Sequence, residues 1–135
     1  MPFDLEIVSP EKLLMSKSVD MAVLPAAEGE MGVLVGHAPM IVLLRGGVIK
    51  LTVGGAVTDS LYVSGGFAEV TPTRVTVLAT EAVEVASLVR SEGNSRLEAA
   101  EAEYAAADKM NTDALDTAMA KMQSAQALID AAPAA

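Results

Sequence analysis

The sequence predicts an antiparallel β-sandwich of about ten short strands, followed by a C-terminal hairpin of two antiparallel helices. Residues 3–86 alternate between apolar and polar side chains and are interrupted by turn residues, which is the pattern of half-buried strands. Glycine pairs separate several of these runs. From residue 95 onward the apolar spacing becomes three and four, as in an amphipathic helix. We therefore expect a sandwich domain over residues 1–88 and a helical domain over residues 89–135.

Each expected strand places a row of apolar residues on one face. In chain order these rows are Phe3, Leu5 and Ile7; Val19, Met21 and Val23; Ile49, Leu51 and Val53; Val57, Leu61 and Val63; Val75, Val77 and Ala79; and finally Val83 and Val85. Gly54-Gly55 is expected to form a tight hairpin turn, because glycine supplies the positive φ angles that such turns need. Gly46-Gly47 and Gly65-Gly66 are expected to be turns of the same kind.

The two helices are expected to begin at capping residues. Ser95-Arg-Leu-Glu98 has the pattern of a capping box, so we expect the first helix to start there. Its apolar stripe is Leu97, Ala100, Tyr104 and Ala107. The segment 110–113 breaks the pattern and offers new N-cap residues. The second stripe is Leu115, Ala118, Met119, Met122, Ala125 and Ile129, and this helix should end before Pro133. Both helices are rich in alanine, so we expect a close, thin helix pair with weak attachment to the sandwich.

Composition limits the possible partners. The chain has 135 residues, of which 52% are hydrophobic and only 3% aromatic, so its core must be aliphatic. A net charge of −9 disfavours binding to nucleic acid and direct docking on anionic lipid. The chain has no cysteine, so it offers no thiolate metal ligand and no indication of an oxidising compartment. Its first residues lack the basic and apolar regions of a signal peptide, so we expect a cytosolic protein.

The residues give little support to catalysis. His37 is the one histidine, and no serine stands in a nucleophile-elbow motif, so local motifs do not assemble a hydrolytic triad. The glycine pairs lack the Lys and Ser/Thr of a phosphate-binding loop. We predict no catalytic, cofactor-binding or metal-binding residue. Two alternatives remain: an autonomous β-sandwich binding module with a helical tail, and a small hydrolase with a pocket around His37.

The segment 28–39 reads Glu-Gly-Glu-Met-Gly-Val-Leu-Val-Gly-His-Ala-Pro. An acidic turn leads into an almost uncharged run, in which His37 is the one strongly polar side chain between Met31 and Leu44. The run is shorter than the roughly 20 residues that span a bilayer, and glycines and a proline interrupt it. An apolar surface of this kind, if it were exposed on a monomer, would mark an interaction site.

This segment and residues 61–70, Leu-Tyr-Val-Ser-Gly-Gly-Phe-Ala-Glu-Val, resemble the epsilon subunit of F-type rotary ATP synthases. That family carries E-G-E-x-G-x-x-x-G-H-A-P and then Y-x-S-G-G-x-x-E-V. The resemblance covers roughly residues 3–80, whereas the C-terminal part agrees in layout only. It implies a non-catalytic central-stalk subunit that couples rotation of the proteolipid ring and gamma to ATP synthesis. The catalytic alpha and beta subunits would be indirect partners, and the complex would hold the chain at the cytoplasmic face of a bacterial inner membrane.

The resemblance also implies contact residues. In the family the acidic turn faces polar loops of the proteolipid ring, which assigns Glu28, Glu30 and Met31 to the ring contact. We further propose that the uncharged run 33–44 packs partly against gamma, because an apolar patch on a free monomer would mark an interaction surface. We take His37, Met40 and Ile41 as its gamma contacts.

Two regulatory properties of some family members are not expected here. Many bacterial members bind ATP through an I/L-D-x-x-R-A motif at the start of the first helix. In this chain Ser87 stands three residues before Arg90 and Gly93 stands three before Arg96, and neither arginine is followed by alanine. The carboxylate and guanidinium of the motif are therefore not presented together, and we expect no ATP binding.

Inhibitory members set basic residues of the second helix against acidic segments of the catalytic subunits. Residues 113–132 of this chain contain three aspartates and one lysine, Lys121, for a net charge of −2. Like charges across an interface cost energy, so weak or no inhibition of ATP hydrolysis is expected. The competing interpretation is that apolar contacts through Met119, Met122 and Ile129 are enough to hold an inhibitory pose.

Overall fold

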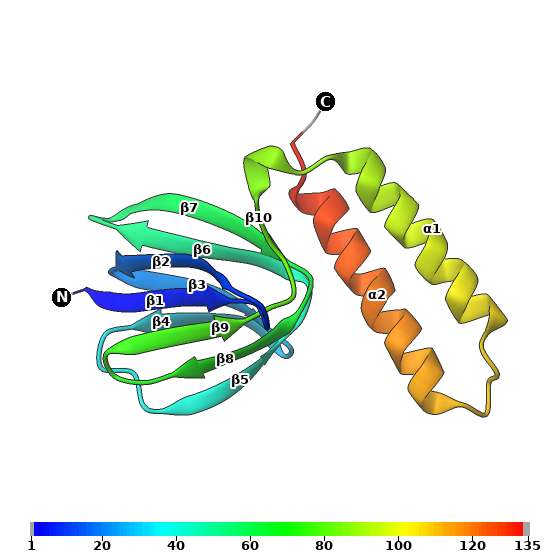
Figure 1. Cartoon of the computed structure of the whole chain (residues 1–135), viewed down its shortest axis with the longest axis horizontal. Coiled ribbons are helices and arrows are strands. Elements are labelled where there is room, and N and C mark those ends of the chain that lie inside the picture. The colour runs from blue at the N-terminus through cyan, green and yellow to red at the C-terminus, as the bar shows by residue number, and fades with distance from the viewer. Residues whose placement is uncertain (1, 134–135) are drawn as a thin grey trace.

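The computed structural model describes residues 2–133 as a ten-stranded β-sandwich with two antiparallel helices set against one end (Figure 1). Residue 1 and residues 134–135, the outermost positions of the two expected domains, lie outside the described residues. The predicted fold class is confirmed. The strands are β1 Phe3–Val8, β2 Leu13–Val19, β3 Met21–Ala26, β4 Gly29–Leu34, β5 Met40–Leu44, β6 Gly47–Val53, β7 Ala56–Val63, β8 Gly66–Val70, β9 Arg74–Leu78 and β10 Ala82–Glu84.

The strands run in the order β10-β7-β6-β3-β5-β8-β9-β1-β2, with β4 paired to β3. The pairs are antiparallel as expected, except that β1 and β9 are parallel. Parallel neighbours require a long crossover connection, and here most of the sandwich lies between the two strands. Lys17 of β2 forms an ion pair with Asp59 of β7 and donates a hydrogen bond to Thr58 at 3.1 Å. This ion pair lowers the pKa of Asp59. It joins β2, at one end of the strand order, to β7, the second strand from the other end.

The aliphatic core follows the alternation of most strands. Phe3, Leu5 and Ile7 are 3%, 0% and 0% exposed, and Val75 and Val77 are fully buried. The expected row in β3 is wrong by one residue. Ala22 and Leu24 face the core there, whereas Met21 and Val23 are partly exposed. The chain turns between β2 and β3, and that turn restarts the alternation.

The glycine pairs have two different roles. Gly54 and Gly55 have φ of +63° and +80° and form the predicted hairpin turn between β6 and β7. Gly46 and Gly47 do not adopt positive φ, so the expectation of the same turn type is wrong for them. A Cβ on Gly46 would lie 2.5 Å from the Cα of Ser124. Gly46 is therefore required for the close approach of the second helix.

The first helix, α1, spans Arg90–Ala106 and follows a 3₁₀ turn at Val85–Ser87. The prediction of a capping box at Ser95 is wrong, because the helix begins at Arg90 and its N-cap, Val89, makes no side-chain hydrogen bond. Gly93 does not interrupt α1. A Cβ there would lie 2.7 Å from Cγ1 of Ile129, so the glycine lets α1 extend along its partner helix.

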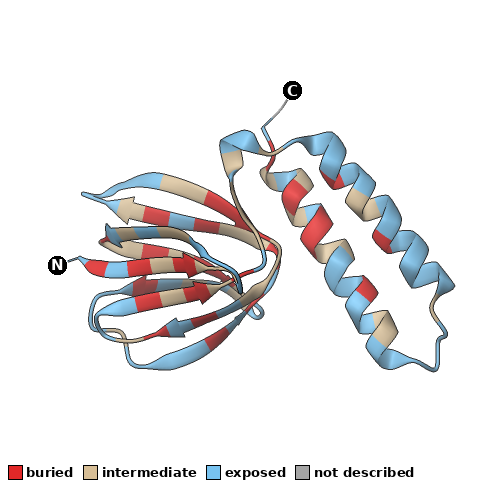
Figure 2. Cartoon of the chain, in the orientation of Figure 1, coloured by how far each residue is buried: buried red, intermediate tan, exposed pale blue. Residues whose placement is uncertain are grey.

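The second helix, α2, spans Thr112–Ala131 and ends before Pro133 as predicted. Its N-cap is Asn111, whose side chain accepts a hydrogen bond from the backbone N–H of Ala114 at 3.1 Å. The buried residues of α2 are Ala118, Ser124, Ala125 and Leu128, while Met119 is 53% exposed. Figure 2 shows the buried positions of the helix pair on the inner sides, where α2 meets α1 and the sandwich. The apolar stripe predicted for α2 omitted two buried residues, Ser124, which contacts Tyr62 of the sandwich, and Leu128, which lies against Gly93 of α1.

The close approach at Gly46 leads to a stability prediction. Gly46→Ala should lower the free energy of unfolding by about 1–3 kcal/mol, because the added methyl group forces α2 away from the sandwich. Gly32→Ala is the matched control, since a Cβ at Gly32 meets nothing within 4 Å, and it should change stability by less than about 0.5 kcal/mol. Urea denaturation measures both. Equal stability of the two variants would contradict the assigned role of Gly46.

Candidate functional site

The residues predicted for the ring contact lie where β3 turns into β4. Glu28 in the turn and Glu30 on β4 are exposed. Met31 is partly buried and packs against the sandwich core. The structure therefore presents the two carboxylates to solvent and leaves only part of the Met31 side chain for a partner.

His37 lies in the connection between β4 and β5, at the end of the sandwich away from the helices (Figure 1). Its side chain is partly buried, and Nδ1 lies 2.8 Å from the carbonyl oxygen of Ala38. Its backbone N–H donates to the carbonyl of Leu34 at 3.2 Å. These local contacts fix the turn. Two clefts lie between the sandwich and the helices, and His37 lines neither of them. They therefore give no support to a hydrolase that uses His37.

An apolar surface covers the outer side of β5 and β8. Ile41 is 72% exposed, Leu43 is 67% exposed and Phe67 is 44% exposed, and Leu43 pairs with Phe67 across the two strands. We call Ile41, Leu43 and Phe67 the β5–β8 face. Met40, at the start of β5, is also exposed. Met40 and Ile41 were predicted from the sequence, whereas Leu43 and Phe67 were not. Their exposure follows from the alternation of β5 and β8 with the buried residues Val42, Leu44, Ala68 and Val70.

A second important region is the junction between α2 and the sandwich. Tyr62 is fully buried, yet it does not belong to the sandwich core. Its hydroxyl donates to the carbonyl of Ser124 at 2.9 Å and lies 2.7 Å from the Ser124 hydroxyl. Burial raises the pKa of Tyr62, so the phenol stays neutral and remains a donor at neutral pH. The side-chain amide of Gln123 accepts from the N–H of Gly46 at 3.0 Å and donates to its carbonyl at 2.7 Å.

We call Gly46, Tyr62, Gln123 and Ser124 the α2 junction. The sequence predicted a weak attachment of the hairpin. The attachment is narrow, but its buried hydrogen bonds satisfy polar groups that would be costly to leave without partners. These bonds fix α2 in one position on the sandwich.

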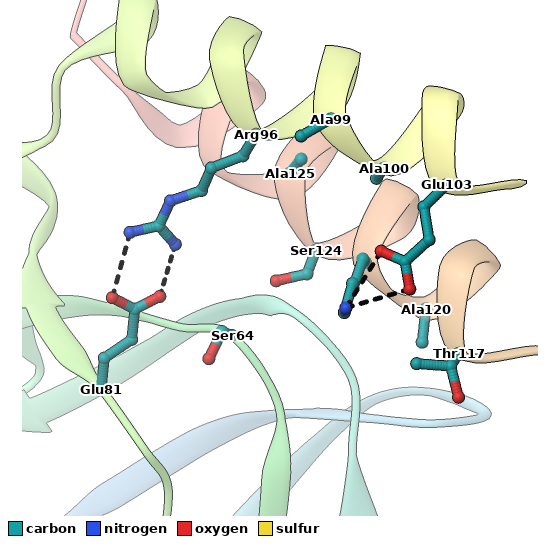
Figure 3. Close-up of a pocket in the computed structure, with 11 residues that line it drawn as sticks. Ser64, Glu81, Arg96, Ala99, Ala100, Glu103, Thr117, Ala120, Ser124 and Ala125 are labelled. Carbon is teal, nitrogen blue, oxygen red and sulfur yellow. Dashed lines mark hydrogen bonds and ion pairs between the residues drawn. The ribbon is translucent and has the colours of Figure 1, made fainter. Parts of the chain in front are cut away.

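The first cleft, of about 630 Å³, lies between the two helices and the sandwich. Figure 3 shows Arg96 of α1 reaching the carboxylate of Glu81, and the Nη–Oε distances are 2.5 and 3.2 Å. Lys121 donates to the carboxylate of Glu103 at 3.0 Å, and both residues also line this cleft. Both cations that line this cleft are therefore already paired with carboxylates of the same chain.

The second cleft, of about 710 Å³, lies between the sandwich and the C-terminal half of α2. Its charged residues are Glu30, Arg45 and Lys50 from the sandwich and Asp130 from α2. Within residues 2–133, none of these four side chains forms an ion pair. Asp130 accepts a hydrogen bond from Gln126 at 2.9 Å.

These features define the class of protein. Among the described residues, no three His, Asp or Glu side chains gather in a way that could hold a metal ion. Neither helix in that part of the chain combines the length and apolar character that crossing a bilayer requires. The chain presents an apolar sheet face, an acidic turn and a docked helical hairpin, which are the features of a protein that binds other chains.

Comparison with known proteins narrows this class to one family. Residues 2–85 match the model of the ATP synthase delta/epsilon chain β-sandwich domain. The chain is 62% identical over 128 residues to the ATP synthase epsilon chain of Granulibacter bethesdensis, with 95% of each chain covered. It is 52% identical over 132 residues to that of Gluconacetobacter diazotrophicus, with 98% of this chain and 94% of the relative covered. The chain belongs to the ATP synthase delta/epsilon family.

A solved structure agrees with this assignment. A chain of the Euglena gracilis mitochondrial ATP synthase, seen by cryo-EM with its c-ring, matches with a TM-score of 0.77 and 25% identity. The match covers 96% of this chain and 81% of that one. The similarity includes the helical part of the chain as well as the sandwich.

Proposed function

We propose that this chain is the non-catalytic epsilon-type subunit in the central stalk of a bacterial proton-transporting ATP synthase. It couples rotation of the proteolipid ring and gamma to ATP synthesis. The β5–β8 face carries the proposal, because it is a cluster of exposed apolar side chains within the domain that matches the family. Such a cluster is characteristic of a surface that a partner covers.

We assign the β5–β8 face, together with His37 and Met40, to gamma. We assign Glu28 and Glu30, with the exposed part of Met31, to the proteolipid ring. Residues 1–88 then form the partner-binding domain and residues 89–135 the helical domain. The catalytic alpha and beta subunits are indirect partners. The complex holds the chain at the cytoplasmic face of the inner membrane as a peripheral component.

We also propose that the helical domain neither binds ATP nor inhibits hydrolysis strongly. The pairing of Arg96 and Lys121 with carboxylates supports the first part, since a phosphate would have to displace those partners. The net charge of −2 over residues 113–132 supports the second part, because an acidic surface on the catalytic subunits would repel α2. The α2 junction adds a further cost to any opening of the hairpin.

The gamma assignment predicts the effect of a buried charge. Ile41→Asp should strongly reduce co-purification of the subunit with gamma, because the interface would bury an unpaired carboxylate. Val57→Asp is the matched control. Val57 is a 57% exposed valine on β7, next to the β6–β7 turn and outside the β5–β8 face, so this variant should assemble normally. If Ile41→Asp assembles as well as the control does, the face is misassigned.

The proposal that the helical domain does not inhibit hydrolysis strongly predicts the effect of removing the hairpin. Deleting residues 95–135 should leave the ATPase activity of the assembled soluble sector nearly unchanged. Recovery of the shortened subunit with gamma provides the check that it has folded and assembled. A several-fold rise in hydrolysis would show that the hairpin inhibits despite its negative charge, and would contradict the proposal.

A further inference from the structure

Within residues 2–133, the strands β2, β4 and β10 each have a single strand neighbour, and two of these three edges are protected. β10 has only three residues and leads directly into the 3₁₀ turn before α1. β2 carries Lys17, whose ion pair with Asp59 joins it to β7. Short edge strands and edge lysines are devices that prevent unwanted strand pairing.

The edge strand β4 has neither device. It is six residues long and pairs with β3 in an unbroken register. After Glu30 it contains no charged residue and no proline. Leu34, its last residue, is 58% exposed, and Val35 beyond it is 41% exposed. Because a long uncharged edge is a template for another strand, β4 is the edge that remains open to a partner.

The pairing of β3 shows how the backbone groups of β4 are directed. Both backbone groups of a residue in an antiparallel strand point to one side, and the side alternates from residue to residue. The carbonyl of Pro25 on β3 accepts from the N–H of Arg45 at 2.9 Å, so Pro25 points away from β4. Leu24, the preceding residue, therefore points toward its partner Met31 on β4.

The same alternation along β4 identifies the groups that point outward. Met31 and Val33 direct their backbone groups toward β3, whereas Gly32 and Leu34 direct theirs to the side where β4 has no strand neighbour. The carbonyl of Leu34 accepts from the N–H of His37 at 3.2 Å. Among the described residues, the N–H groups of Gly32 and Leu34 and the carbonyl of Gly32 have no backbone partner. Both residues are exposed, so an extended segment can reach these groups.

We propose that an extended segment of gamma adds to the free edge of β4 as a further strand, through main-chain hydrogen bonds to Gly32 and Leu34. This inference rests on the proposed function. Continuity of the surface favours gamma as the occupant, because β4 leads directly into His37 and Met40, which are assigned to gamma.

Strand addition differs from the side-chain contact proposed for the β5–β8 face. Its affinity comes from main-chain hydrogen bonds, and its selectivity comes from alternate side chains of the added segment. The part of that segment beside Gly32 and Leu34 should be uncharged, because β4 offers no opposite charge there and a buried, unpaired charge is costly. The two contacts together would hold gamma at both the edge and the face of the sandwich.

Hydrogen exchange tests strand addition in the unmodified chain. Exchange of individual amides is compared between the free subunit and the assembled soluble sector, which contains gamma and lacks the proteolipid ring. We expect the amides of Gly32 and Leu34 to exchange about tenfold more slowly, or slower still, in the soluble sector. The amides of Met31 and Val33 point toward β3 in both states, so they are the internal control and should change less.

The outcomes separate this inference from the proposed function. If the subunit is recovered with gamma but exchange at Gly32 and Leu34 is unchanged, strand addition is overturned and the proposed function stands. Failure to recover the subunit with gamma would overturn the proposed function, and this inference with it. Protection that appears in the free subunit and rises with its concentration would assign the edge to a second copy of the chain instead of gamma.

A matched pair of variants provides a second readout. Leu34→Lys places an edge-protecting charge on β4, so it should weaken binding of the full-length subunit to gamma by about tenfold. Leu13→Lys is the control, because Leu13 is 56% exposed and lies on β2, the edge that Lys17 already protects. This control should bind gamma as the wild type does. Equal binding of the two variants would contradict the role of β4.

Discussion

The position of the helical hairpin depends on a place where the backbone of the sandwich has no side chain. At Gly46, the Cα of Ser124 approaches so closely that a methyl group would not fit. This proximity lets Gln123 bind both backbone groups of Gly46 and lets Ser124 bind the buried hydroxyl of Tyr62. A buried polar contact of this kind stabilises one arrangement strongly, since a shifted helix would leave several groups unsatisfied. Both clefts between sandwich and hairpin exist only in that arrangement.

The chain separates its proposed partner surfaces in space. The β5–β8 face is apolar and lies on the outside of the sheet, and it is assigned to gamma. The acidic turn lies near the end of the sandwich that meets α2, and it is assigned to the ring. An apolar face gives affinity through buried area, whereas charged groups set orientation and partner choice. A subunit that transmits rotation between two partners needs both properties at once.

The sequence predicted the features that depend on near neighbours. The alternation of Phe3, Leu5 and Ile7, the turn at Gly54-Gly55 and an N-cap within residues 110–113 are all local, and all were found. Gly46, Gly93 and Tyr62 could not be interpreted in the same way. Their roles come from contacts with α2, which lies tens of residues later in the chain. The first helix was predicted to start at Ser95, after Gly93, because a sequence cannot show that a facing helix occupies the space of the missing side chain of Gly93.

The candidate surfaces also divide into those that local sequence predicts and those that depend on distant contacts. The motif around Glu30 and its resemblance to a known family pointed to the acidic turn. The alternation within β5 also contained Ile41 and Leu43 as an outward pair. The second cleft was not predictable, because it arises only when Arg45 and Lys50 face Gln126 and Asp130 across the junction.

Hydrogen exchange of the free subunit tests most directly whether the α2 junction fixes the hairpin. The backbone amides of residues 124–128 should exchange slowly in the wild type, since opening α2 breaks the contacts of Tyr62 and Gln123. Tyr62→Phe should accelerate their exchange by roughly fivefold or more, which corresponds to the loss of about 1 kcal/mol from one buried hydrogen bond. The amides of β1 and β9 should keep their rates. Rapid exchange of α2 in the wild type, unaffected by Tyr62→Phe, would contradict a fixed hairpin.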